Sequence, residues 1–257
     1  MSSKNITTNL YNNTIAQNYD LDRFNLLSDT HQIALNQIEQ NSRSQDINSI
    51  LDLALGTGAI LTKLKPIFPQ AKLMGIDLSS EMIAVAQQKL DVVAFNDSAE
   101  NISKYVSYDR TDLILVHFLL AYVNPQIIIA EAAKLLSSGG LLSIATSTYQ
   151  SFPKLQSLAS KFLTPEELNL AQVPQDADAL ASLLDSVGLE IVRTEVLNKK
   201  VNFSTFDEAY HWGKDSGWFT QYLVNLSPEK IAAISAIPDL FPFEDKFQST
   251  IILSRKK

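Results

Sequence analysis

The clearest chemical signal in this sequence is a pair of glycines followed, at a fixed distance, by an acid. Gly56 and Gly58 come directly after the apolar run 50–55, and Asp77 closes a second apolar run about 20 residues later. Glycines let the backbone approach a ligand closely, and an acid at the end of the second strand accepts hydrogen bonds from both hydroxyls of a ribose. The spacing predicts a site for an adenosine-containing cofactor.

Two classes of cofactor use this geometry, and position 61 discriminates between them. A dinucleotide-binding loop is written Gly-x-Gly-x-x-Gly, but the third glycine position is Leu61. The pyrophosphate fingerprint is therefore incomplete. A nicotinamide-dependent oxidoreductase is kept as a disfavoured alternative.

The segment ILDLALGTGAIL resembles the first motif of the class I S-adenosylmethionine-dependent methyltransferases, in which an acid precedes Gly-x-Gly-x-Gly. Asp52 matches the acid, and Gly56 and Gly58 match the second and third glycines. Ala54 stands where the family has its first glycine, which leaves close approach possible if its φ is negative. The resemblance implies S-adenosyl-L-methionine as the cofactor, bound by these four residues.

Four further segments resemble later motifs of the same family, in the family's order. GIDLSSEMIAVAQQKL resembles the second motif, which implies that Asp77 binds the ribose and that Leu78 and Met82 flank the adenine. NDSAENI resembles the third, which implies that Asp97 and Ser98 hold the adenine amino group. TDLILVHFLLAYV and EAAKLLSSGGLLSIAT resemble the fourth and fifth blocks.

The elements that must position these residues are apolar runs separated by helical patterns. Such alternation is typical of βαβ units and a parallel sheet, and the two late runs suggest an antiparallel hairpin. We expect an α/β fold, a Rossmann-like three-layer sandwich with a mostly parallel seven-stranded sheet whose last strand is antiparallel. The expected strands are 49–55, 72–76, 92–95, 113–116, 141–145, 190–197 and 248–254.

Capping residues mark the helices between the strands. Ser79 is expected to begin one helix, and Asn124 followed by Pro125 another, which ends at the Ser-Ser-Gly-Gly segment 137–140. We predict an N-terminal helical cap or lid over 1–46, with one helical segment from 14 to 40. The cofactor-binding core then spans 47–257, with a helical insertion over about 201–246 that includes 206–212 and 228–237.

Residues after the fourth strand are expected beside the transferred methyl group. His117 is a candidate base, acceptor-orienting group or cofactor contact, since imidazole titrates near neutrality, but a packed histidine fits equally well. Tyr122 has the same two interpretations. A general base is optional, because methyl transfer is an in-line displacement that mainly requires positioning.

Aromatic residues elsewhere are candidates for the acceptor pocket. Tyr11 and Tyr19 lie in the predicted cap, Phe118 and Tyr122 follow the fourth strand, and Trp218 lies in the insertion. Aromatic walls favour planar or hydrophobic acceptors, while ordinary core packing would produce the same pattern. The other two histidines, His31 and His211, are expected to be surface or cap residues.

Composition excludes several classes of protein. The 257 residues carry a formal net charge of −7 and no cysteine, which disfavours a nucleic-acid partner, disulfides and a Cys-ligated metal; no metal site is predicted. Apolar runs are too short to span a membrane, and the sequence fits a cytoplasmic protein, a monomer or a homodimer. The Asn/Asp-Pro-Pro-Tyr/Phe motif of amino-directed methyltransferases is missing, so the predicted acceptor is a small organic molecule methylated on O, N or C. The alternative is an inactive protein that binds the cofactor as a regulator or partner.

Overall fold

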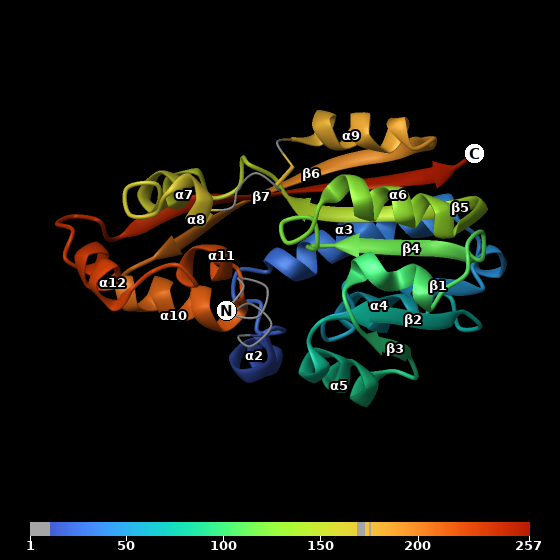
Figure 1. Cartoon of the computed structure of the whole chain (residues 1–257), viewed down its shortest axis with the longest axis horizontal. Coiled ribbons are helices and arrows are strands. Elements are labelled where there is room, and N and C mark those ends of the chain that lie inside the picture. Colours follow the sequence, from blue (N-terminus) through green and yellow to red (C-terminus); the bar gives the residue numbers. More distant parts are fainter. Residues whose placement is uncertain (1–10, 169–172, 175) are drawn as a thin grey trace.

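The computed structural model describes residues 11–168, 173–174 and 176–257. They form a seven-stranded sheet in the order β3-β2-β1-β4-β5-β7-β6 (Figure 1). The first five strands are parallel, and β7 runs antiparallel to both β5 and β6, which confirms the predicted mixed sheet. The strands are β1 (Ser49–Asp52), β2 (Lys72–Asp77), β3 (Val93–Asn96), β4 (Thr111–His117), β5 (Leu136–Ser147), β6 (Leu189–Phe203) and β7 (Phe243–Lys256).

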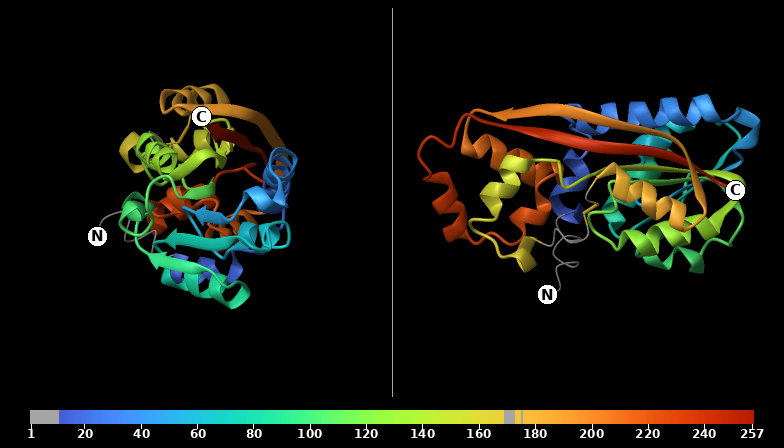
Figure 2. Two further views of the ribbon diagram at one scale, coloured as in Figure 1. Left: turned by 90° about the vertical axis from the view of Figure 1, so that its right-hand side faces the viewer. Right: turned by 90° about the horizontal axis from the view of Figure 1, so that it is seen from above.

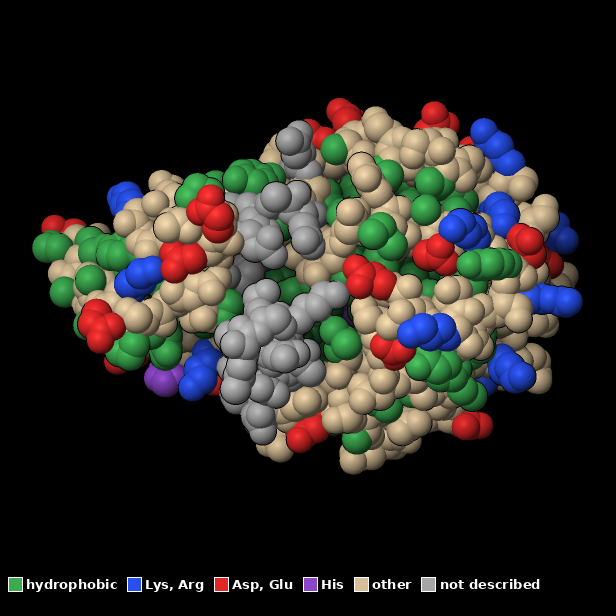
Figure 3. Space-filling view, viewed as in Figure 1, with side chains coloured by type: hydrophobic (Ala, Val, Ile, Leu, Met, Phe, Trp, Pro, Cys, Tyr) green, Lys and Arg blue, Asp and Glu red, His purple; other side chains and the backbone are tan. Residues whose placement is uncertain are grey.

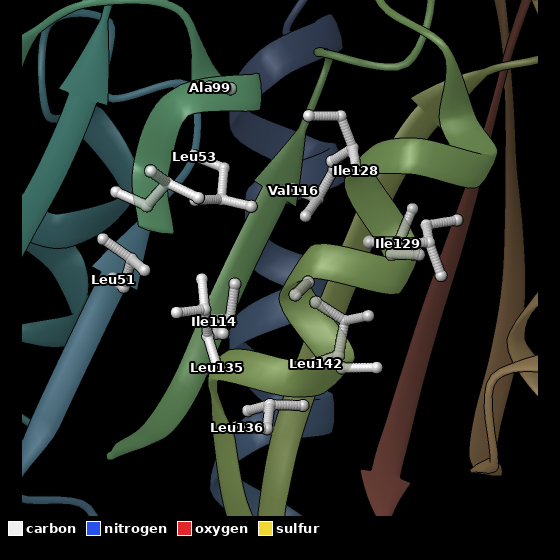
Figure 4. Packing of buried hydrophobic residues seen from close by; sticks show 14 of the residues in the cluster. Leu51, Leu53, Ala99, Ile114, Val116, Ile128, Ile129, Leu135, Leu136 and Leu142 are labelled. Carbon is white, nitrogen blue, oxygen red and sulfur yellow. The ribbon is translucent and has the colours of Figure 1, made fainter. Parts of the chain in front are cut away.

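Helices cover both faces of the sheet because its central strands are apolar on both sides. Ile114 and Val116 of β4 face the layer that contains α6 and α9, while Leu113 and Leu115 face the layer that contains α3, α4 and α5 (Figure 4). No helix in the described residues is long and apolar enough to cross a membrane. The covering elements are α3 (Leu26–Asn41), α4 (Ala59–Leu64), α5 (Ser80–Lys89), η3 (Ala99–Lys104), α6 (Pro125–Leu135) and α9 (Ala177–Ser186).

The predicted helix caps are present. The side chain of Ser79 accepts a hydrogen bond from the Met82 backbone, and Asn124 caps α6 with Pro125 in its first turn. The segment 137–140, which we expected to end the helix, is instead part of β5, which begins at Leu136. A register irregularity in the β4–β5 pairing accommodates these extra residues.

The last two strands are longer than predicted. They pair from Leu189 opposite Lys256 to Phe203 opposite Phe243, so the segment between them is 204–242 rather than 201–246. Their outer halves extend past the other strands and carry a helical lobe, drawn at the left of Figure 1 and seen from above in Figure 2. Aromatic residues fill the core of this lobe. Its helices are α7 (Pro153–Ala159), α8 (Pro165–Leu168), α10 (Phe206–Ser216), α11 (Thr220–Leu223) and α12 (Pro228–Ser235).

The predicted N-terminal helical segment 14–40 is divided into separate helical elements. A π-helical turn, η1 (Tyr11–Ile15), leads into the short α2 (Ala16–Asn18), and a turn then precedes α3. The Asp22 carboxylate begins α3 by accepting from the backbone N–H groups of Leu26 and Ser28, both at 2.7 Å. A short 3-10 turn, η2 (Ser44–Asp46), connects α3 to the sheet.

Candidate active site

A cavity of about 210 Å³ lies where β1, β2 and β4 end, at the point where the strand order reverses. We call it the first cavity. This switch point is where open α/β sheets bind ligands. Of the predicted residues it brings together Tyr11, Tyr19, Ala54, Gly56, Asp77, Leu78, Met82, Ser98, His117, Phe118 and Tyr122. Residues in its wall that the sequence analysis did not identify are Leu53, Ser79, Ala99, Leu119, Ala121, Val123, Glu167, Val224 and Asn225.

The Asp77 carboxylate is the most strongly organised polar group of this wall. One oxygen accepts from the Gly56 backbone N–H and the other from the Ser79 backbone N–H, both at 2.8 Å. Burial raises the pKa of Asp77, and the backbone hydrogen bonds oppose that rise. Since a carboxylate can accept about four hydrogen bonds, two sites are left for a ligand.

The two glycines of the loop have different roles. Gly56 has φ +50° and lines the cavity, whereas Gly58 has φ +74° and packs on α5. A Cβ at Gly58 would lie 3.2 Å from Cβ of Ala86, so a side chain would push α5 away. Ala54 does not have a positive φ, so its methyl group causes no backbone strain at the position of the family's first glycine.

Asp52 lies behind this wall rather than in it. Its side chain is buried, and its Oδ1 accepts from the Ala54 backbone N–H at 3.1 Å. Burial raises its pKa to about 7, because one backbone hydrogen bond compensates little of the cost of desolvating the carboxylate. Of the predicted cofactor residues, Asp52, Gly58 and Asp97 are not in the wall of the first cavity.

The Asp97 carboxylate is engaged in its own turn. It accepts from the Ser98 backbone N–H at 2.7 Å, from Asn101 Nδ2 at 2.8 Å and from the Tyr105 hydroxyl at 3.0 Å. The hydrogen bond from Asn101 is the largest cause of a lowered Asp97 pKa. Asp97 therefore fixes the turn that brings Ser98 to the cavity.

His117 is a buried, neutral imidazole. Its Nε2 lies 3.0 Å from Ser143 Oγ, and its Nδ1 has no partner among the described residues. Burial lowers its pKa to about 3, so the ring lacks the near-neutral titration that the sequence suggested. This favours packing or orientation over proton transfer.

His31 lies in α3, within the segment 1–46 predicted as the cap, and its side chain is buried. Its ring stacks at a tilt on His117, with 5.6 Å between centroids, and burial lowers its pKa well below the usual value. His211 is exposed. Among the described residues, no group of three or more His, Cys, Asp or Glu side chains could hold a metal ion.

Three tyrosines stand at the inner end of the first cavity. The hydroxyls of Tyr11 and Tyr122 lie 3.2 Å apart, and the Tyr11 and Tyr19 rings are 6.4 Å apart. Burial raises the pKa of all three phenols. The N-terminal segment thus meets the residues after β4 directly.

Polar contacts also tie the N-terminal segment to the glycine loop. Thr57 donates its hydroxyl hydrogen bond to Asp20 at 2.7 Å, and Lys89 pairs with the same carboxylate at 2.6 Å. Ser79 donates to the Asn12 side chain at 2.7 Å. These contacts hold the segment 12–20 against the glycine loop and the start of α5.

A second cavity of about 70 Å³ adjoins the first, beyond the end of β5 and against the helical lobe. Both cavities are lined by Tyr11, Tyr19, Phe118, Ala121 and Tyr122. Trp218 lines only the second cavity, and its ring meets Phe118 edge to face at 5.1 Å. The other residues of its wall are Thr146, Ser147, Thr148, Ser151, Phe152, Gln156, Val173, Ser216, Gly217 and Tyr222.

Comparison with known sequences identifies the central part of the chain. Residues 50–140 match a family model described as a methyltransferase domain. Over 122 residues the chain is 32% identical to the malonyl-(acyl-carrier protein) O-methyltransferase of Bacillus cytotoxicus. This match covers 47% of this chain and 43% of the relative. The chain thus matches less than half the length of that relative.

Solved structures share the whole architecture at low sequence identity. The YcgJ protein from Bacillus subtilis superposes with a TM-score of 0.61 at 14% identity, covering 90% of this chain and 99% of that one. The plantazolicin methyltransferase BamL, solved with a triazolic desmethylPZN analog and SAH, has a TM-score of 0.52 at 21% identity over the full length of both chains. Residues 50–140 thus match a methyltransferase domain, and the seven-stranded sheet has the fold of these solved structures, which is the fold expected for a class I S-adenosylmethionine-dependent methyltransferase.

Proposed function

We propose that this chain transfers a methyl group from S-adenosylmethionine to a small organic acceptor. The observation that carries the proposal is the junction of two cavities at the sheet's switch point. The first cavity has a carboxylate, Asp77, with two free acceptor positions for the ribose of an adenosyl ligand. The second cavity adjoins the first and shares five residues of its wall.

The residues of the first cavity fit the cofactor. Asp77 would accept from the ribose hydroxyls, and Leu78 and Met82 would flank the adenine beside Ser98. The backbone at Ala54 and Gly56 would face the methionine end, with Asp52 behind it as a buried carboxylate. When bound, the cofactor supplies an electrophilic methyl group on a positively charged sulfur.

The remaining task of the protein is to position the acceptor and exclude water. Phe118 has φ +53°, a strained value for a phenylalanine, and this turn places it in the walls of both cavities. His117 and Tyr122 would orient the acceptor by hydrogen bonds as neutral groups. The segment 1–46 would act as the lid, since Tyr11 and Asp20 already contact the core.

A free small molecule suits this surface better than a carrier protein. The malonyl-(acyl-carrier protein) enzymes act, by their name, on a carrier-bound acid, and a strongly acidic partner would require a cationic docking surface. On the face shown in Figure 3, Lys and Arg side chains are spread among acidic ones. Lys230 is already paired, at 3.3 Å, with Glu167 of the first cavity's wall.

Calorimetry and a transfer assay test the proposal. S-adenosylmethionine and S-adenosylhomocysteine should bind the purified protein, and NAD should not. Transfer of a labelled methyl group to an organic extract would support the enzyme. Binding of the adenosylated ligands without transfer to any acceptor would favour the inactive, regulatory alternative, and binding of NAD alone would refute both.

A further inference from the structure

We propose that the second cavity selects an uncharged, planar acceptor that carries a hydroxyl group, and rejects carboxylates. This inference rests on the proposed function, because it assigns the substrate class of the same site. It is carried by the composition of the cavity wall and by the pair of tyrosines at the junction.

The described wall of the second cavity holds no Lys, Arg, His, Asp or Glu. Its side-chain polar groups are hydroxyls, the Gln156 amide and the indole N–H of Trp218, none of which is charged. Several of them already have partners: Thr148 donates to Gln248 at 3.1 Å, and Gln156 donates to the Ser151 carbonyl oxygen at 2.6 Å. A carboxylate buried there would lack a cationic partner, and the loss of hydration would oppose binding.

The titratable side chains around the two cavities also lie in surroundings that disfavour charge. Burial raises the pKa values of Tyr11, Tyr19 and Tyr122 and lowers that of His117, so each group is shifted toward its neutral form. A medium that disfavours both phenolate and imidazolium also disfavours an anionic acceptor.

Aromatic rings form the walls against which the acceptor would lie. Phe118 and Trp218 meet edge to face, and Trp218 is held from behind by Phe247, with 5.0 Å between ring centroids. Phe152 on the other side is fixed against Phe219 at 5.3 Å. These rigid, packed rings favour a flat, apolar body.

The hydroxyl of the acceptor would replace an existing interaction. Tyr11 and Tyr122 share a hydrogen bond of 3.2 Å at the junction of the cavities, and both line each cavity. An acceptor hydroxyl placed between them would accept from one phenol and donate to the other, so no buried polar group is left unsatisfied. In the transfer, the acceptor oxygen bonds to the methyl carbon, the carbon–sulfur bond breaks with its electron pair going to sulfur, and the hydroxyl proton leaves to water.

A matched pair of probes tests this inference by binding rather than by turnover. With the protein saturated by S-adenosylhomocysteine, calorimetry would compare 2-naphthol with 2-naphthoate, which share one ring system and differ in charge. We expect 2-naphthol to bind at least about tenfold more tightly. Equal or tighter binding of 2-naphthoate, or no binding of either, would overturn the inference. Failure of S-adenosylhomocysteine itself to bind would instead refute the proposed function.

A charge placed in the wall should reverse the preference. Ser147 lies at the end of β5 and lines the second cavity, and its hydroxyl has no partner among the described residues. Ser147→Lys should raise the affinity for 2-naphthoate at least about tenfold over that of Ser147→Met, which adds similar bulk without charge. Equal affinities in two variants that both still bind S-adenosylhomocysteine would show that charge in this wall does not determine the choice.

Discussion

Replacing Asp77 by alanine should remove most of the affinity for the cofactor. Each Asp77 oxygen accepts one backbone N–H in the structure, which leaves acceptor positions for two ribose hydroxyls. A hydrogen bond to a charged acceptor contributes about 1.5 to 3 kcal/mol, and displaced water offsets part of the sum. We therefore expect Asp77→Ala to cost about 2 to 4 kcal/mol, or roughly 30-fold to 1,000-fold in the Kd of S-adenosylhomocysteine.

Asp112 provides the matched control, because it lies near the start of β4, at the opposite end of the parallel strands from Asp77. Its Oδ2 also accepts from two backbone N–H groups, those of Asn48 at 2.9 Å and Ser49 at 3.1 Å. Asp112→Ala should therefore lower stability in a comparable way while leaving the Kd unchanged. Calorimetric titration with S-adenosylhomocysteine, under conditions in which both variants are folded to the same extent, compares their Kd values. Wild-type affinity in Asp77→Ala, or an equal loss in Asp112→Ala, would refute the assignment of Asp77 to the ribose.

Two further predictions concern buried groups whose pKa values are shifted by desolvation. The Asp52 pKa of about 7 lies above the unfolded value of about 4, so the folded state holds an extra proton between these values and stability falls as pH rises through them. Asp52→Asn should match the parent near pH 5 and exceed it at pH 8, by on the order of 3 kcal/mol in urea unfolding; an equal difference at both values would contradict the shift. For His117, the imidazole should show no titration between pH 5 and 8 by NMR, because burial lowers its pKa to about 3, and a midpoint near 6.5 would restore it as a candidate base.

The sheet order and the first cavity were predictable because they depend on local patterns. Strands buried on both faces are continuous apolar runs, and residues at their carboxyl ends converge at one edge of the sheet. Asp77, Ser98 and His117 therefore meet although 40 residues separate the first from the last. Motif order alone was enough to place them.

The second cavity was less predictable because it depends on contacts between distant segments. Ser147 and Trp218 share a wall only because β6 and β7 extend past the sheet and carry the lobe beside β5. Strand length is set by that pairing, which no local pattern encodes. The burial of His31 was not predictable for the same reason, because it depends on α3 lying against the end of β4.

Backbone N–H groups explain why the pKa rises differently at the two buried carboxylates of the site, Asp52 and Asp77. Asp52 and Asp77 are both desolvated, but Asp77 accepts hydrogen bonds from the backbone N–H groups of Gly56 and Ser79, whereas Asp52 accepts one, from Ala54. The larger rise in pKa is accordingly at Asp52, and desolvation lowers the pKa of His117. Backbone donors that stabilise a carboxylate thus lie at the end of β2, where the proposed cofactor binds, while the groups around the acceptor are shifted toward their neutral forms. This separation makes a charged acceptor the less favourable substrate, since the protein supplies stabilising dipoles only on the cofactor side.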